Sequence, residues 1–341
     1  MLNPSVFSAS QHAQFPRWAA CLAVTSLLAL SGCAAVELKL GMKVHLEKVP
    51  VTSMQATMPK GPGIAPGEKS PLVVTFTRPD GKSLKTEGAG QGKVMWKDLT
   101  VTTSVVEVNK KGIVSLRSDP RVSDGKLPHV IIIAPSHPDL RAEFDVPLRY
   151  DRKFSSYFSG SSGSSGTTGT SGSDGTSGSM GSFDPDHPKP GGDGGDGTDG
   201  GNGGNGGRGE DGPPVFVRVA LRSGDRPLLQ VGVSTHGGET FFLVDPQGGS
   251  LTVSSAGGSG GSGGKGGRGG RGGSGGSGIP SGSRGRDGSD GHDGSDGPSG
   301  NGGKITVTYD PDAGPFLSAI RLSNAGGPRP VYLEQPVAAL W

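Results

Sequence analysis

The chain has 341 residues, of which 65 are glycine and 27 are proline, and its formal net charge is +2 at pH 7. A charge so close to zero argues against a nucleic-acid-binding protein, which would carry a concentrated basic face. The only cysteines are Cys21 and Cys33. We expect no structural disulfide, because Cys21 lies in a stretch with the features of a removable leader.

Residues 1–32 have the pattern of a secretory signal. Arg17 supplies positive charge, residues 19–30 form an apolar stretch too short to span a bilayer comfortably, and small residues follow. The sequence Leu30-Ser31-Gly32-Cys33 resembles the lipobox of bacterial lipoproteins. The resemblance implies that Cys33 is lipidated and becomes the first residue of the mature protein. The alternative is an ordinary signal with a cysteine at this position by chance.

The lipoprotein resemblance also implies a location. In that family, an alanine after the lipidated cysteine, here Ala34, implies sorting to the outer membrane. Outside residues 1–32, no run of 18 apolar residues predicts a membrane-spanning helix, so we expect the lipid to be the membrane anchor. The expected location is the bacterial cell envelope, on the periplasmic or the surface face of the outer membrane.

Runs of β-favouring residues follow the leader. Residues 36–47 alternate apolar and polar side chains almost perfectly, which predicts a half-buried strand. Clusters of Pro, Gly, Asn and Asp predict turns between further short runs. This spacing predicts an antiparallel β-sandwich of immunoglobulin-like size over residues 33–159. The other predicted strands are residues 72–77, 99–108, 113–116, 130–133 and 144–150.

Glycine occupies every third position through four blocks. Blocks 1 and 2, residues 160–183 and 191–214, have eight triplets each and are joined by a short Pro-rich turn. Block 3, residues 257–280, also has eight triplets, and block 4, residues 282–302, has seven. A single residue, Ser281, separates the last two blocks. Such regularity indicates architecture, but it does not indicate an activity.

A period of three matches neither the α-helix nor the β-strand. It matches the extended left-handed polyproline-type helix, which has three residues per turn and a rise of about 3.1 Å per residue. A stripe of glycine on such a helix allows another backbone to approach closely. Because these helices make no internal hydrogen bonds, their amide groups need water or a neighbouring helix as partner.

Three interpretations of the blocks compete. A collagen trimer requires far more proline than the blocks contain. Flexible Gly/Ser linkers are the second interpretation, but linkers have no reason to keep phase or equal length. The third is a bundle of polyglycine II helices formed within one chain, which the equal lengths favour. In the repeats alone, the blocks resemble the glycine-rich bundles of snow-flea-type antifreeze proteins and of some phage adhesin tips.

Further β-favouring runs in residues 215–256 and 303–341 predict a second β module. Two long Gly-X-Y hairpins, residues 160–214 and 257–302, would project from it. Blocks 2 and 3 are mostly Gly-Gly-X and offer two bare faces, so we expect them at the centre of the bundle. The predicted fold class is therefore all-β with four polyglycine II helices. The structural glycine stripe predicted for blocks 2 and 3 is Gly191, Gly194, Gly197, Gly200, Gly203, Gly206, Gly257, Gly260, Gly263, Gly266, Gly269 and Gly272.

No catalytic, cofactor-binding or metal-binding constellation is predicted. Residues 257–261 match the spacing of a nucleophile elbow, but they lack the strand-to-helix context that makes its serine reactive. Residues 88–93 resemble a phosphate loop whose spacing is one residue short and whose Ser/Thr is missing. The histidines after the leader show no metal-ligand spacing. We expect no cofactor.

Charged side chains form rows along the blocks. Acidic rows share the third triplet position of blocks 2 and 4, and a basic row shares the third position of block 3. Opposed rows would align neighbouring helices, although exposed ion pairs contribute only about 0–1 kcal/mol each. Residues 191–196 also match the start of a calcium-binding RTX-like repeat, but they lack its nine-residue period and apolar residue. The rows are Asp193, Asp196, Asp199; Asp287, Asp290, Asp293, Asp296; and Lys265, Arg268, Arg271.

Two functions from different classes fit these observations. The first is a non-enzymatic envelope lipoprotein whose β module displays the glycine bundle as a spacer or an adhesive surface, with a glycan or an envelope protein as partner. Ice is a further surface that the polar array would suit. The second is an enzyme or ligand-binding β-sandwich that disordered glycine blocks tether. A nucleic-acid partner is not expected.

Overall fold

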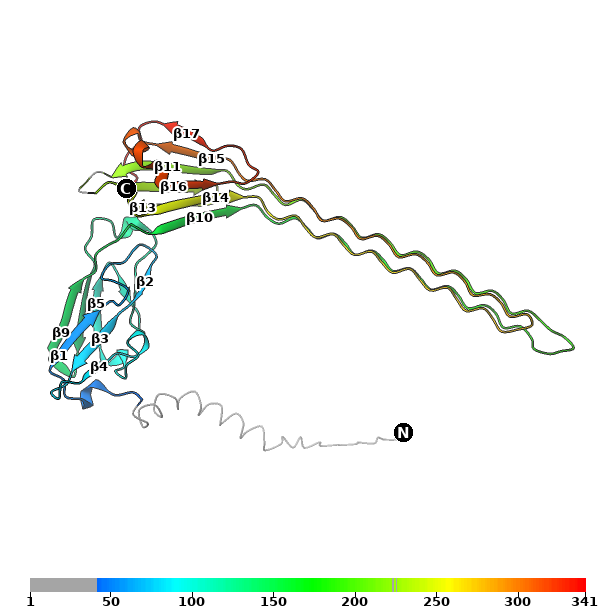
Figure 1. Cartoon of the computed structure of the whole chain (residues 1–341), viewed down its shortest axis with the longest axis horizontal. Helices are drawn as coiled ribbons and strands as arrows, with labels where there is room; N and C mark the ends of the chain where they lie inside the picture. Colours follow the sequence, from blue (N-terminus) through cyan, green and yellow to red (C-terminus); the bar gives the residue numbers. More distant parts are fainter. Residues whose placement is uncertain (1–41, 223, 225) are drawn as a thin grey trace, which may run out of the picture. The chain divides into compact units, whose positions relative to one another are not determined.

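The structure, a computed structural model, describes residues 42–222, 224 and 226–341. It is all-β, with short 3-10 helices between the strands (Figure 1). No helix among the described residues is long and apolar enough to cross a membrane. The predicted signal, Cys33 and Ala34 lie outside the described residues.

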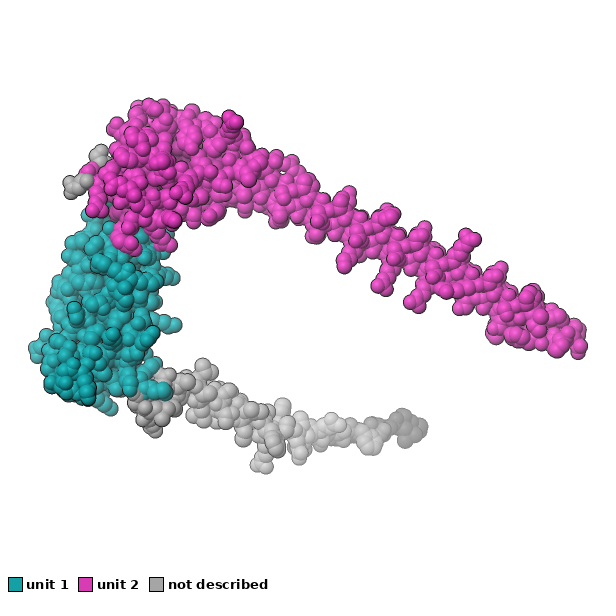
Figure 2. Space-filling model, viewed as in Figure 1, with its two compact units in different colours: residues 1–118, 122–148 teal, residues 119–121, 149–341 magenta. Residues whose placement is uncertain are grey.

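The chain divides into two compact units (Figure 2). Of the described residues, the first unit comprises 42–118 together with Val122–Leu148, and the second comprises Asp119–Arg121 together with those from Arg149 to Trp341.

Three small antiparallel sheets surround one apolar cluster in the first unit. Phe76, Leu72 and Ile132 are fully buried in this cluster. Its 3-10 helices are η1 (Leu46–Lys48), η2 (Gly88–Gly90) and η3 (Trp96–Asp98); η4 (Pro120–Val122) lies at the boundary of the two units, with Pro120 and Arg121 in the second. The sheets are β1 (Ser53–Thr57), β3 (Val73–Thr77), β4 (Ser83–Lys85); β2 (Lys69–Pro71), β7 (Ile113–Ser115), β6 (Glu107–Val108); and β5 (Thr100–Ser104), β8 (His129–Ala134), β9 (His137–Asp145).

Three strand predictions need correction. The strand predicted over residues 144–150 lies earlier in the chain: β9 ends at Asp145, and Leu148 makes only an isolated bridge. Of the strand predicted over residues 36–47, the described part is not a strand: Val44 makes one isolated bridge, and η1 begins at Leu46. The Leu46 amide donates a hydrogen bond to the Asp98 carboxylate, so it is not available to a ladder. The strand predicted over residues 99–108 is interrupted at Val105, whose φ of 66° no extended strand adopts.

The base of the second unit consists of two sheets over a shared apolar core. The parallel sheet contains β10 (Lys153–Ser159), β14 (Ser250–Ala256) and β16 (Ile320–Ser323), in that order. The five-stranded sheet has the order β13 (Gly238–Val244), β12 (Leu228–Thr235), β11 (Val215–Arg222), β15 (Ile305–Tyr309) and β17 (Val331–Glu334). The 3-10 helix η5 (Pro311–Ala319) contributes Ala313 and Ala319 to the core.

Strand β10 belongs to this second unit, although the sequence predicts that residues 33–159 form one sandwich. It pairs with β14 along seven residues, and Phe154 and Phe158 pack against the core of the second unit. The partner strand is nearly 100 residues away in the chain, which is why local sequence does not reveal this boundary.

The strands of the base continue directly into the glycine blocks (Figure 1). Strands β10 and β14 lead into blocks 1 and 3, and blocks 2 and 4 lead into β11 and β15. In the β10–β14 pair, Ser159 lies opposite Ala256, and the same offset of 97 residues recurs in the bundle, where the Ser259 hydroxyl bonds to that of Ser162. The strands therefore set the register of blocks 1 and 3.

The second pair of blocks follows the same rule. In β11 and β15, Val215 lies opposite Ile305. That offset of 90 residues is also the separation between Asp193 in block 2 and Ser283 in block 4, which are hydrogen-bonded. Each parallel pair of blocks thus inherits its register from the sheet on which it stands.

We expect the phase of a block to matter more than its length. Insertion of one serine between Ala256 and Gly257 would place the third-position side chains of block 3 in first-position sites, which have no room for a Cβ. The variant should lose the cooperative thermal transition of the bundle, measured by circular dichroism. Insertion of Gly-Gly-Ser at the same point keeps the phase and should retain the transition. Equal melting of the two variants would contradict the register argument.

Candidate functional site: the glycine-block bundle

Hydrogen bonds join the four blocks into one bundle. First-position glycine amides of block 1 donate to block 3, as from Gly163 to the Ser259 carbonyl at 2.8 Å. Those of block 2 donate to block 4, and those of block 4 donate to block 3. Second-position amides join block 2 to block 1 and block 3 to block 2, as from Gly264 to the Gly204 carbonyl at 2.8 Å.

Blocks 2 and 3 occupy the centre of this bundle. Each of them exchanges backbone hydrogen bonds with all three other blocks, whereas blocks 1 and 4, both fully described, share none with each other. In block 3 the second-position glycines from Gly258 to Gly276 are buried, and the third-position residues are exposed. This is the arrangement that the Gly-Gly-X composition predicts.

The predicted glycine stripe faces neighbouring backbone throughout. A Cβ on any stripe residue of block 2 would overlap the carbonyl oxygen of a second-position glycine in block 3; for Gly200 that residue is Gly267. A Cβ on any stripe residue of block 3 would overlap a first-position carbonyl of block 4; for Gly266 that residue is Gly291. The second-position glycines of block 3, which the predicted stripe omits, are equally close to block 1.

The acidic rows do not align the blocks by pairing with the basic row, and that hypothesis is wrong. The carboxylates of Asp193, Asp196 and Asp199 accept hydrogen bonds of 2.6–2.7 Å from backbone amides of block 4. Asn202 serves the same purpose for the His292 amide at 2.8 Å, so the oxygen acceptor matters more than the charge. The Asp row of block 4 likewise accepts from first-position amides of block 3, as Asp290 does from Gly269.

The Asp side chains accept from backbone amides because of the conformation of the blocks. A block with no internal hydrogen bonds leaves amides that no neighbouring carbonyl reaches, and a carboxylate is a strong acceptor for such a donor. The basic row, Lys265, Arg268 and Arg271, lies exposed on the third positions of block 3 and makes no ion pair with described residues. Sequence shows the charges but not which amides lack partners.

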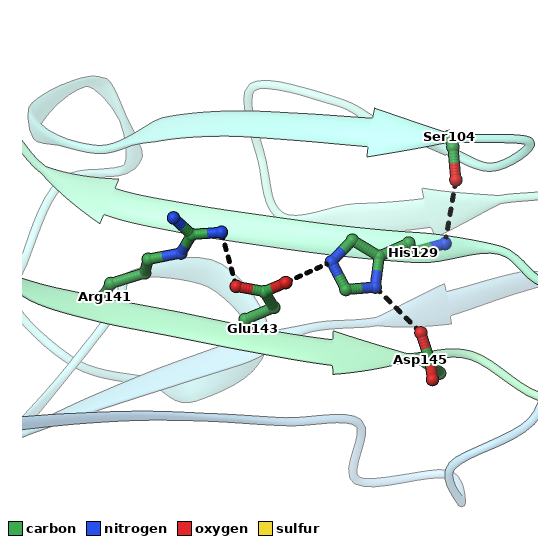
Figure 3. Close-up of polar contacts among 5 residues, drawn as sticks. All are labelled: Ser104, His129, Arg141, Glu143 and Asp145. Carbon is green, nitrogen blue, oxygen red and sulfur yellow. Dashed lines mark hydrogen bonds and ion pairs between the residues drawn. The ribbon is translucent and has the colours of Figure 1, made fainter.

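A polar cluster in the first unit was not predicted (Figure 3). The two ring nitrogens of His129 each lie 2.8 Å from a carboxylate, Nδ1 from Asp145 and Nε2 from Glu143. Arg141 pairs with the other side of Glu143. His129 and Asp145 lie directly opposite in the β8–β9 pair, so the pairing of the two strands is the signal that would have found the cluster.

The geometry of this cluster favours the imidazolium form of His129. The hydrogen bond to Asp145 is the main cause that raises the pKa of His129 above its ordinary value, against a smaller effect of desolvation, and Glu143 adds to the rise. Desolvation raises the pKa of Glu143, but hydrogen bonds from Arg141 and His129 outweigh it and hold that pKa below its ordinary value.

This cluster is not arranged as a nucleophilic triad. The Ser104 hydroxyl accepts from the His129 backbone amide at 3.1 Å, and both ring nitrogens face carboxylates. Among the described residues, no group of three His, Cys, Asp or Glu side chains is placed to hold a metal ion. Residues 257–261 lie in block 3, and the loop at residues 88–93 begins with the 3-10 turn η2 and leads into no α-helix.

Comparison with family models, with curated proteins and with solved structures found no match to this chain. The geometry of the described residues is therefore the basis for a functional proposal.

Substitution on the stripe should destabilise the bundle as a whole. Gly200→Ala places a Cβ against the Gly267 carbonyl, and we expect a loss of about 1–3 kcal/mol, as for other overpacked sites. Thr168→Ala, on an exposed third position of block 1, should change stability by less than about 0.5 kcal/mol. Thermal melting followed by circular dichroism measures both. If the two variants melt alike, the blocks are linkers.

The cluster around His129 should make the stability of the first unit depend on pH. A histidine whose pKa is raised by folding contributes stability below its unfolded pKa of about 6.5 and loses that contribution as the pH rises through the folded value. Relative to His129→Gln, the native chain should therefore lose stability as the pH rises above about 6.5. Urea unfolding reported by buried Trp96, with Trp18 and Trp341 replaced by Phe, tests this. Identical pH profiles would contradict it.

Proposed function

We propose that this chain is a non-enzymatic bacterial envelope lipoprotein in which a β-sheet base displays the four blocks as an ordered rod. One observation carries the proposal. Hydrogen bonds between the blocks continue from Gly160 and Ala256, beside the base, to Gly181 and Ser277 at the far end. A disordered tether has no need of partners at every triplet, so this geometry favours the rod over the tether.

We assign the blocks to the polyglycine II conformation. Two observations support the assignment: backbone bonds recur at every third residue and run between blocks, and no glycine of the four blocks has a positive φ. At a rise of about 3.1 Å per residue, a block of 24 residues would be on the order of 75 Å long. A circular dichroism signal of polyproline type, lost in the transition that Gly200→Ala displaces, tests this assignment.

The hydrogen bonds favour a bundle within one chain over a collagen-type trimer. The first-position amides of blocks 1, 2 and 4 find carbonyl acceptors within the same chain. Several of those in block 3, including Gly266 and Gly269, find carboxylates of block 4. A second and third chain are not needed to satisfy these donors.

The surface of the rod suits a polar partner. Its exposed side chains are mainly Ser, Thr, Asp and Asn with a few cations, and such groups form hydrogen bonds with the hydroxyls of a glycan or with the polar surface of an envelope protein. The near-neutral net charge argues against nucleic acid. The rod would serve as a spacer between its base and a partner or as an adhesive surface.

The lipobox-like residues support a lipid anchor at Cys33, with the outer membrane as the location. Cys33→Ser should move the protein to the soluble fraction and abolish labelling by a fatty-acid analogue, because acyl chains would be the anchor. Cys21→Ser is the matched control and should leave both properties unchanged. Membrane association and labelling that persist in Cys33→Ser would overturn the anchor.

A further inference from the structure

The first unit contains a cleft of about 460 Å³ that the bundle does not involve. It lies beside two strands that form the edges of different sheets: β5 pairs only with β8, and β6 pairs only with β7. The chain turns sharply between β5 and β6 at Val105, and the two strands separate instead of pairing. The space between the two edges is of the size that small-molecule sites usually have.

The floor of the cleft is apolar and firmly held. Trp96, Leu99, Val101 and Val108 line it. The backbone amide and the ring Nε1 of Trp96 both donate to Glu87, at 3.2 and 3.3 Å.

A glycine makes room for this tryptophan. Gly112 has a φ of 71°, and a Cβ on it would overlap the indole of Trp96. The ring therefore lies directly against the backbone of the β6–β7 turn, and its position is fixed by packing as well as by hydrogen bonds.

Two of the four polar residues around the floor are cationic. Lys97 and Lys110 line the cleft, and neither has a carboxylate partner among the described residues. Glu87 also lines the cleft, but its carboxylate forms an ion pair with the Lys43 ammonium group at 3.0 Å. The Asn109 side-chain oxygen accepts from the amides of the next turn, which leaves its NH₂ group as a donor.

We propose that this cleft binds a small apolar molecule that carries one anionic group. The floor of four apolar side chains takes the body of the ligand, and the ammonium groups of Lys97 and Lys110 with the amide of Asn109 take the anion. An apolar floor with few polar groups at one side is the usual composition of a ligand site. The cleft belongs to the first unit alone and does not depend on the proposed display of the bundle.

Two fluorescent probes with the same apolar body test the proposal on the full-length chain. The anion 8-anilinonaphthalene-1-sulfonate should quench Trp96 fluorescence, with Trp18 and Trp341 replaced by Phe, and it should bind more tightly than uncharged N-phenyl-1-naphthylamine. The double variant Lys97→Gln/Lys110→Gln should weaken binding of the sulfonate by at least about tenfold, since two ion pairs are lost. Binding of the uncharged probe should stay the same.

The control variant removes the same charge elsewhere. Lys48→Gln/Lys60→Gln changes two exposed lysines that do not line the cleft, and it should leave both affinities unchanged. Val108→Phe, which fills the floor without adding a second tryptophan, should abolish quenching by both probes. The proposal is overturned if the sulfonate binds equally well after Lys97→Gln/Lys110→Gln, if both double variants weaken it equally, or if neither probe quenches Trp96.

Discussion

The register between the glycine blocks is the constraint on which the second unit depends. A repeat of three leaves this register degenerate, because a block displaced by one whole triplet presents the same glycine stripe to its neighbours. The base removes the degeneracy. Strands β10 and β14 are offset by 97 residues and β11 and β15 by 90, and the same separations recur in the side-chain hydrogen bonds of the bundle. Sheet formation and bundle formation are therefore one process, and the apolar core of the base supplies the stability on which the rod depends.

The rod itself is held by polar contacts without an apolar core. Net stabilisation from each hydrogen bond is small, about 0.5–1.5 kcal/mol, while ordering of the backbone costs about 1–2 kcal/mol per residue. Two features reduce this imbalance. Unfolded chain already populates the polyproline-type conformation that we propose for the blocks. The carboxylates and amides of the third positions also satisfy backbone donors that no carbonyl reaches, as Asp196 does for Arg286 and Asn202 for His292. The Asp rows thus belong to the hydrogen-bond network of the backbone.

Sequence predicts those features of the chain that repeat or that are local. The phase of glycine and the Gly-Gly-X composition predict which blocks lie at the centre, because each bare face needs a neighbour. The role of Asp193 is not predictable in the same way, since the unpartnered amide that it serves lies 90 residues away. The same limit applies to β10, whose partner strand follows the first hairpin, and to His129, whose carboxylates come from the neighbouring strand. For residues 42–47, the alternation of apolar and polar side chains correctly predicts that Leu46 is buried. It wrongly predicts a β-strand, because the Leu46 amide donates to a side-chain carboxylate and not to a neighbouring strand.

The positions of the triplets differ in which side chains the structure of the bundle tolerates. First positions must be glycine throughout, and second positions of block 3 must be glycine from Gly258 to Gly276, because a Cβ would overlap backbone there. Third positions of blocks 1, 2 and 4 are restricted to short side chains with an oxygen acceptor wherever they accept from an amide of an adjacent block, as Asp174, Asp196 and Asp290 do. No third-position side chain of block 3, all of which is described, accepts such a hydrogen bond. Only in this block do the third positions of three consecutive triplets expose long cationic side chains. Chemistry that recognises a partner therefore has the most freedom at the third positions of block 3, where a change of side chain leaves the network of backbone hydrogen bonds intact.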